Sequence, residues 1–186
     1  MRTSDADILF VPGLGNSGPD HWQTRWEKKL STARRVEQED WERPKLEDWI
    51  ARLLEEVANS QASKRPAVLI AHSLGSLAVV HAAPLLAPRQ IAGAYLITPP
   101  SNGAITALPD LDPAFVPAPM TALPFPSVLV ASRNDPYGSF ADAQAKAQAW
   151  GSTLVDAGDA GHINTESGHG PWPEGLMRLA TFLKTL

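Results

Sequence analysis

The sequence predicts an α/β fold: a mostly parallel sheet of about six strands with helices on both faces. Short apolar runs alternate along the chain with segments of helical periodicity, the pattern of strands joined by crossover helices. The main runs are apolar throughout, as expected for strands buried on both faces. At 186 residues the chain is long enough for one sizeable core, so we expect residues 1–186 to form a single three-layer domain.

Each element is predicted from its local pattern. Continuous apolar runs bounded by turn residues indicate strands, and apolar residues three and four positions apart indicate helices. The clearest helix is 46–58, where six apolar side chains repeat at helical spacing. In chain order the expected strands are 8–11, 34–38, 67–70, 93–97, 127–131 and 153–155, and the expected helices are 20–30, 46–58, 76–80, 141–150 and 174–183.

The segment between the fourth and fifth strands interrupts this alternation. Residues 99–126 contain eight of the seventeen prolines and show no helical or strand period. A connection of this length inside a compact domain is usually functional or mobile. Two hypotheses stay open for it: a proline-stiffened surface loop, or a loop that covers a substrate.

Composition argues against several classes of protein. The net charge is −4 and no run is rich in Lys or Arg, which argues against nucleic-acid binding. The absence of cysteine excludes disulfides, cysteine nucleophiles and thiolate metal sites. Residues 1–7 lack the apolar stretch of a signal peptide, and the apolar stretch 67–87 is interrupted by His, Ser and Pro, which argues against a membrane span. We therefore expect a cytoplasmic protein that binds neither nucleic acid nor membrane.

The most informative motif is Ala71-His72-Ser73-Leu74-Gly75, which lies between a strand pattern and a helix pattern. A serine with a small residue two positions away on each side is typical of a nucleophile elbow. The sharp strand-to-helix turn strains the backbone at the serine and brings other chain segments so close that small residues are required. We expect Ser73 Oγ to be exposed at the end of the sheet, above a helix N-terminus that favours developing negative charge.

An aspartate and a histidine are expected at the same edge of the sheet as Ser73. In an open parallel sheet, ligands bind beyond the carboxyl ends of the strands. Asp135 follows the strand at 127–131 and His162 follows the last strand. The chain order Ser, Asp, His is that of α/β-hydrolases. His162 is predicted to take the proton of Ser73 and pass it to the leaving group, and Asp135 to hold the imidazole in the required tautomer.

The oxyanion formed by attack on a carbonyl needs backbone N–H donors. One is expected from Leu74, directly after the nucleophile. The second is expected from the loop after the first strand, at Leu14, because the flanking glycines 13 and 15 let that backbone approach a substrate closely.

Alternative interpretations of these residues stay open. Ser73 is also compatible with a helix N-cap, and Asp135 with a turn before Pro136 or a cap of the next helix. His169 competes with His162, which is favoured because it follows the last strand by a few residues. Asp156 and Asp159 are rival acids, but they lie on the histidine's own connection, where the order Ser, Asp, His predicts no acid. His72 and His81 lie inside an apolar run and are expected to be core or helix-surface histidines. No His-x-x-x-His pair or cysteine is available, so neither a metal nor a cofactor is expected.

The rival motif is Gly13-x-Gly15-x-x-Gly18, which follows a strand and precedes a helix, as in dinucleotide-binding proteins. In that fingerprint the helix begins near the second glycine, so that its N–H groups meet the pyrophosphate. Pro19 would then lie past the first turn, where it costs about 3 kcal/mol. We expect Pro19 to be the first residue of a helix that starts late, which leaves residues 13–18 as a wide loop better suited to an oxyanion hole.

Further motifs resemble one family. They are Val11-Pro12-Gly13, Asp20-His21-Trp22-Gln23, the elbow, Ser132-Arg133-Asn134-Asp135-Pro136, Gly161-His162-Ile163-Asn164, Glu166-Ser167-Gly168 and Gly170-Pro171-Trp172-Pro173-Glu174-Gly175. Together they resemble the small serine hydrolases that include retinoblastoma-binding protein nine and the bacterial YdeN-like proteins. The resemblance covers nearly the whole chain. It implies a reduced α/β-hydrolase fold without a large lid domain, a triad of Ser73, Asp135 and His162, and hydrolysis of small carboxylic esters or amides.

One position departs from this family pattern, because Ala71 stands where the elbow usually has glycine. Trp22 is expected to pack the first helix. For His21, two roles stay open: a hydrogen-bonding residue at the helix start, or part of the pocket rim.

The leading hypothesis is therefore a carboxylesterase-like serine hydrolase that acts on a small ester or amide through an acyl-enzyme. One alternative is a protein-interaction module that keeps the fold with little turnover, since fold alone does not fix function, and a protein partner stays open. A less favoured alternative is a nucleotide-binding enzyme that uses residues 13–18.

Overall fold

The structure, a computed structural model, describes residues 1–62, 64–87 and 89–186. Six strands form one sheet in the order β2-β1-β3-β4-β5-β6, and each pairing in it is parallel. The strands are β1 (Asp7–Val11), β2 (Ala33–Arg35), β3 (Ala67–His72), β4 (Ile91–Ile97), β5 (Ser127–Ala131) and β6 (Thr153–Asp156). The prediction of a sheet of about six mostly parallel strands is confirmed.

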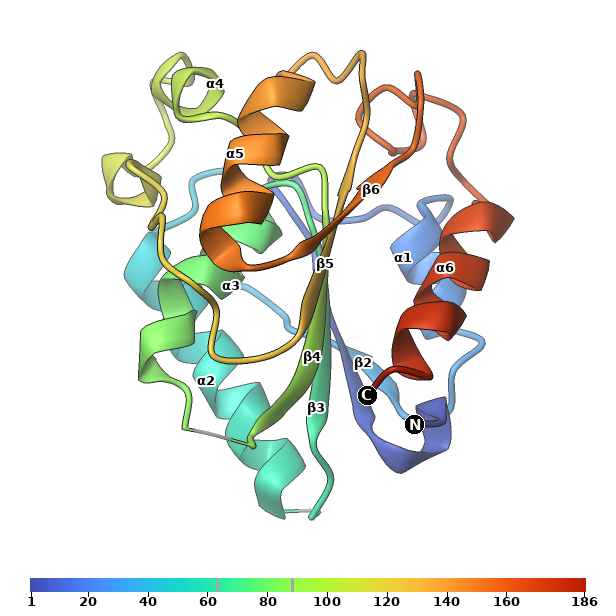
Figure 1. Cartoon of the computed structure of the whole chain (residues 1–186). Helices are drawn as coiled ribbons and strands as arrows, with labels where there is room; N and C mark the ends of the chain where they lie inside the picture. Colours follow the sequence, from blue (N-terminus) through green and yellow to red (C-terminus); the bar gives the residue numbers. More distant parts are fainter. Residues whose placement is uncertain (63, 88) are drawn as a thin grey trace.

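Helices cover both faces of the sheet (Figure 1). Three helices lie on one face, α2 (Leu46–Ala62), α3 (Leu74–Ala82) and α5 (Phe140–Trp150), and two on the other, α1 (Trp22–Glu27) and α6 (Pro173–Leu183). Successive side chains of a strand point to opposite faces. In β1, Leu9 belongs to the core under α2 and α3, whereas Phe10 belongs to the core under α1 and α6. The central strands β1, β3, β4 and β5 are mainly apolar because each of them supplies side chains to both cores.

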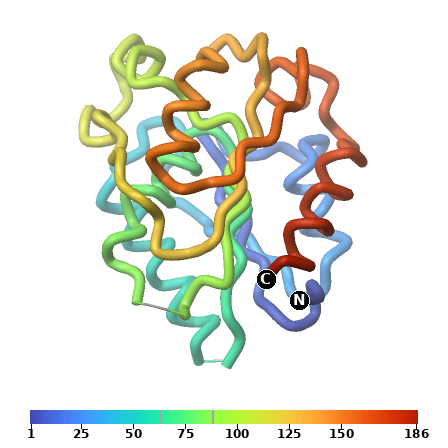
Figure 2. Tube along the Cα trace, in the orientation of Figure 1, coloured from blue at the N-terminus to red at the C-terminus, as the bar shows by residue number. Residues whose placement is uncertain are grey.

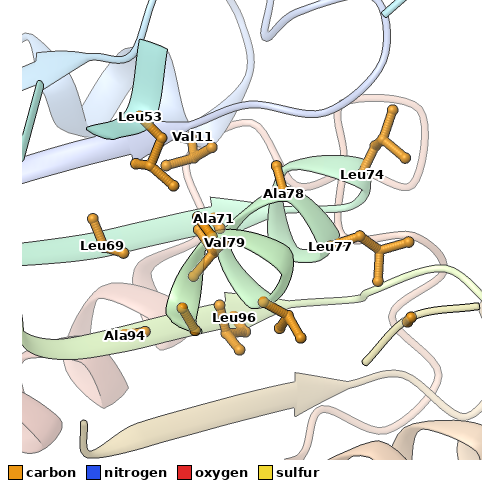
Figure 3. Close-up of a cluster of buried hydrophobic side chains, with 14 of the residues drawn as sticks. Val11, Leu53, Leu69, Ala71, Leu74, Leu77, Ala78, Val79, Ala94 and Leu96 are labelled. Carbon is orange, nitrogen blue, oxygen red and sulfur yellow. The ribbon is translucent and has the colours of Figure 1, made fainter. Parts of the chain in front are cut away.

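Helix α3, which begins directly after Ser73, is deeply buried. Eight of its nine residues are buried, so it is held on all sides rather than along one stripe. Figure 3 shows Ala78 and Val79 of α3 against Ala71 and Leu96 of the sheet, with Leu53 of α2 nearby. This packing fixes the position at which the chain leaves β3 and enters α3, which is where Ser73 lies.

The first helix is shorter than the expected 20–30, and the prediction that Pro19 is its first residue is wrong. His21 is the N-cap of α1, and its Nδ1 accepts a hydrogen bond from the Gln23 N–H at 3.2 Å. The His21 N–H donates to the Gly18 carbonyl at 3.1 Å, so a turn separates Pro19 from the helix. The helix therefore begins later still than predicted, and residues 13–18 form a wide loop.

The proline-rich segment 99–126 contains two short helices that its sequence pattern did not predict. They are α4 (Asn102–Thr106) and a 3₁₀ helix, η3 (Pro113–Phe115); two other 3₁₀ turns are η1 (Thr3–Asp5) and η2 (Ala83–Leu85). Ile105 and Phe115 of the segment are buried in the core under α2 and α3. Part of the segment is thus core rather than surface loop.

The two ends of the chain lie close together at one end of the molecule (Figure 2). The N-terminal ammonium of Met1 donates to the Leu183 carbonyl at 2.7 Å. Within the described part of the chain, no helix combines the length and the apolar character that a bilayer span needs.

Candidate active site

Ser73 occupies a strained turn between β3 and α3. Its φ of 53° lies in the left-handed region, which non-glycine residues rarely adopt. Two residues further on, a Cβ on Gly75 would lie 2.3 Å from the Val11 carbonyl oxygen and 2.4 Å from that of Pro12, so only glycine fits there. Ala71, on the other side of the turn, is fully buried, and the structure accommodates its methyl group at the position where the family pattern has glycine.

A hydroxyl, an imidazole and a carboxylate form one hydrogen-bonded chain at this edge of the sheet. Ser73 Oγ lies 2.9 Å from His162 Nε2, and His162 Nδ1 lies 2.9 and 3.1 Å from the two oxygens of Asp135. The side chains of His162 and Asp135 are 8% and 4% exposed, so water is largely excluded from the pair. Because Nδ1 faces a carboxylate it carries a proton, and Nε2 of the neutral ring is left to accept the serine proton.

The alternative interpretations of Ser73 and Asp135 can be compared with this geometry. Ser73 precedes α3 at the N-cap position, but its side chain makes no capping hydrogen bond and is directed to His162. Asp135 Oδ1 does accept from the Tyr137 N–H at 2.9 Å, so the aspartate begins a turn as well as contacting the imidazole. The cap of α5 is Ser139, whose Oγ accepts from the Asp142 N–H.

Three hydrogen bonds from neighbouring segments hold the loop that contains His162. Asn134 Oδ1, next to Asp135, accepts from the Gly161 N–H at 2.6 Å, which ties the aspartate loop to the histidine loop. The Trp22 indole N–H donates to the Ile163 carbonyl at 2.8 Å. His72 Nε2 lies 2.8 Å from the carbonyl oxygen of His162 itself, and since a carbonyl only accepts, His72 is the donor.

Three imidazoles are in successive ring contact at the site, and all three line the cavity above Ser73. The ring centroids of His21 and His72 are 5.0 Å apart, and those of His72 and His162 are 4.9 Å apart. Burial holds the pKa of His72 well below its usual value, and the nearby His162 and His21 lower it further. Burial, with Arg35 and His162, lowers the pKa of His21 to about 4. At neutral pH both rings are uncharged, so neither opposes a positive charge that develops on His162.

The loop after β1 lies directly against the elbow. A Cβ on Gly13 would be 2.8 Å from Ser73 Cβ and 3.2 Å from the Leu74 nitrogen, so this approach requires glycine. The approach brings the segment with Leu14 beside Leu74, the first residue of α3, and the first N–H groups of a helix have no intrahelical acceptor. The two predicted oxyanion donors therefore belong to adjoining backbone segments.

Two polar side chains that the sequence analysis did not single out hold this loop. Gln23 is fully buried; its Nε2 donates to the Ile70 carbonyl at 3.1 Å, and its Oε1 accepts from Ser17 Oγ at 2.6 Å. Arg35 donates to Asn16 Oδ1 at 2.8 Å and is paired with Glu27 at 2.8 Å. The wide loop is thus fixed by side chains from α1 and β2.

A cavity of about 380 Å³ opens above Ser73 and His162. Ile105, Leu108 and Leu111 of the segment 99–126 line part of it. The proline-rich segment therefore forms a wall of the cavity, in line with the hypothesis that it covers a substrate. His21 also lines the cavity, so both of the roles left open for it, helix cap and pocket residue, are met.

The competing candidates lie elsewhere. His169 Nδ1 is 3.2 Å from Ser167 Oγ, and His81 Nε2 donates to the Phe115 carbonyl at 3.1 Å. Asp156 forms an ion pair with Arg133 at 2.6 Å, and Asp159 is exposed. Among residues 1–62, 64–87 and 89–186, no group of three His, Asp or Glu side chains is arranged to hold a metal ion.

Sequence reasoning missed the part of His72 in this site. It was expected to be a core or helix-surface histidine, and it is indeed buried. Its bond to the His162 carbonyl depends on residues 90 positions apart, which no local pattern reports. The available signal was its position directly before Ser73, at the carboxyl end of a buried strand.

The parallel sheet, its helices and the turn at Ser73 define the α/β-hydrolase fold. The family model described as serine hydrolase matches residues 8–181, and the chain belongs to this family. It is similar over 98% of its length to a protein described as a YdeN-like hydrolase from Pectobacterium atrosepticum, with 94% of that chain covered, 36% identity and a TM-score of 0.86. The resemblance expected from the motifs is thereby confirmed.

Two further solved structures share the fold. The ydeN gene product of B. subtilis is 21% identical over 96% of this chain and 99% of that one, with a TM-score of 0.77. Esterase 2 of Thermogutta terrifontis is 19% identical over 100% of this chain and 85% of that one, with a TM-score of 0.72. No curated protein sequence matches the chain.

Proposed function

We propose that this protein is a carboxylesterase-like serine hydrolase that cleaves small esters or amides through an acyl-enzyme on Ser73. The observation that supports this most strongly is the continuous hydrogen-bonded chain from Ser73 through His162 to Asp135 at the floor of a cavity. Membership of the serine hydrolase family agrees with it. A hydroxyl is a poor nucleophile at neutral pH and needs such a base within hydrogen-bond reach.

In the acylation step, Ser73 Oγ attacks the carbonyl carbon of the substrate while its proton moves to His162 Nε2. The carbonyl oxygen becomes an oxyanion, which the N–H groups of Leu14 and Leu74 receive. The tetrahedral species then collapses: the bond to the leaving group breaks, and His162 returns the proton to the departing oxygen or nitrogen. Asp135 stabilises the imidazolium throughout and keeps its Nε2 directed at the serine.

Deacylation repeats these steps with water in place of the alcohol or amine. His162 Nε2 accepts a proton from the water, whose oxygen attacks the acyl carbon. The tetrahedral species expels Ser73 Oγ, which recovers the proton, and the carboxylic acid leaves. Reactants and products balance as one ester or amide and one water giving one acid and one alcohol or amine.

The proposal is tested by measuring ester hydrolysis in three variants, one at the predicted nucleophile and one at each of two histidines. Turnover of p-nitrophenyl butyrate is expected to be abolished in Ser73→Ala and in His162→Ala, because each removes a group that reacts directly. His169→Ala, the matched histidine control, is expected to keep most of its turnover because His169 contacts Ser167 rather than the reacting groups. Persistent turnover in purified Ser73→Ala would reject the proposal.

A further inference from the structure

The cavity above Ser73 has two chemically different walls. Figure 1 shows α4 and the loop after β6 on opposite sides of the carboxyl edge of the sheet. The α4 side presents the apolar side chains Ile105, Leu108 and Leu111. The loop after β6 presents Asn164, Thr165 and Glu166. A substrate bound across Ser73 therefore has one end against hydrocarbon and the other against amide, hydroxyl and carboxylate groups.

The position of His162 decides which end of a substrate meets which wall. His162 must return its proton to the leaving group, so the leaving group departs on the side of the imidazole. Asn164, Thr165 and Glu166 follow His162 within four residues and line the cavity, as does Tyr137, whose ring centroid lies 4.5 Å from that of His162. The acyl group then extends the other way, toward the apolar side chains of the segment 99–126.

The charge on the leaving-group side is negative. Of the described residues that line the cavity, Glu166 alone has a carboxylate, and none of them is Lys or Arg. Glu166 is exposed and forms no ion pair within the described residues, so its charge is not neutralised. Two neighbouring cations are each paired with a carboxylate: Arg35 with Glu27 at 2.8 Å, and Lys146, which donates to the Pro100 carbonyl, with Asp142. The His21 and His72 rings are neutral at pH 7.

We propose that the site prefers substrates with an apolar acyl group and a leaving group that is cationic or uncharged, and that Glu166 disfavours anionic leaving groups. This inference rests on the proposed serine-hydrolase function, because it uses the direction of proton return by His162. Unit charges about 4 Å apart in water interact by about 1 kcal/mol, a factor of about five in kcat/KM for an exposed carboxylate. The effect should weaken as salt screens it.

Three thioesters with the same butyryl group test it: butyrylthiocholine (cationic), its uncharged 3,3-dimethylbutanethiol analogue, and S-butyryl-3-mercaptopropionate (anionic). Thiol release with a chromogenic disulfide gives kcat/KM for wild type and Glu166→Gln. Because intrinsic leaving-group reactivity is the same for both proteins, the wild-type-to-variant ratio isolates the charge. The ratio should be about five for the cation, about one for the neutral compound and about one fifth for the anion at low salt.

Glu47→Gln on α2 is the matched control, since it makes the same change in net charge at an exposed position that does not line the cavity. It should leave all three rates unchanged. In wild type, the preference for cation over anion should shrink as NaCl is raised to about 0.5 M. If the wild-type-to-variant ratio were equal for all three thioesters in protein that still hydrolyses p-nitrophenyl butyrate, the charge inference would be overturned and the proposed function would stand. No turnover of any ester would instead overturn the proposed function, and the inference with it.

Discussion

Replacing Gly75 with alanine tests whether close packing at the elbow sets both stability and catalysis. The new Cβ would lie 2.3 Å from the Val11 carbonyl oxygen and 2.4 Å from that of Pro12. A carbon–oxygen contact normally needs about 3.3 Å, so either β1 or α3 must move by about 1 Å. Overpacking of this kind costs about 1–3 kcal/mol, and a 1 Å displacement of catalytic groups costs about a hundredfold in rate. We expect Gly75→Ala to lose about 3 kcal/mol in the free energy of unfolding and about a hundredfold in kcat/KM.

The assay is urea unfolding for stability and p-nitrophenyl butyrate hydrolysis at a temperature where the variant stays folded. Gly103→Ala in α4 is the matched control, because its Cβ would lie 3.9 Å from Ser101 Oγ, an ordinary contact. Alanine also favours a helix over glycine by about 1 kcal/mol, so this control should be as stable as wild type or slightly more so. If Gly75→Ala matched Gly103→Ala in both measurements, close packing at the elbow would not be what positions Ser73.

Three further predictions concern stability, rate and chain length. The pKa of His21 is about 4 in the folded protein against 6.5 when unperturbed. The unfolded chain therefore binds a proton that the folded chain excludes, and His21 should lower the free energy of unfolding by about 3 kcal/mol as pH drops from 6.5 to 4. Urea unfolding across this range should show a smaller loss of stability in His21→Gln than in wild type. The same loss in both proteins would contradict the lowered pKa of His21. Asp135→Asn should lower kcat/KM about 10³- to 10⁴-fold with little change in fold by circular dichroism, and a near-normal rate would exclude a role for Asp135. Leu108→Trp should lower the ratio of kcat/KM for p-nitrophenyl octanoate to kcat/KM for p-nitrophenyl acetate about tenfold, because the larger side chain fills the apolar wall of the cavity. An unchanged ratio would mean that the acyl chain binds elsewhere.

The main elements of the fold were predictable because the strands are buried on both sides. β1, β3, β4 and β5 are continuous apolar runs, and each appears where the sequence predicts a strand. The limits of α1 were not predictable, because the His21 cap and the Gly18–His21 turn set its start. α4 and η3 span five and three residues, too few for a hydrophobic period to emerge.

The meeting of Ser73, Asp135 and His162 could be predicted from the sequence because the parallel sheet places the carboxyl ends of β3, β5 and β6 at one edge. The residues that hold them could not be named in the same way. Gln23 is tied to Ile70, and His72 to His162, by bonds between segments far apart in the chain. Such contacts depend on how loops pack against one another, which residue patterns along a single strand or helix do not record.

The activation of Ser73 by His162 is tested most directly by covalent labelling. Purified protein treated with a fluorophosphonate should gain one adduct, and peptide mass spectrometry should locate it on Ser73. We predict stoichiometric labelling of wild type, none in Ser73→Ala and very slow labelling in His162→Ala. An unlabelled wild type, or an adduct on another serine that persists in Ser73→Ala, would contradict the mechanism and favour an interaction module on a hydrolase fold.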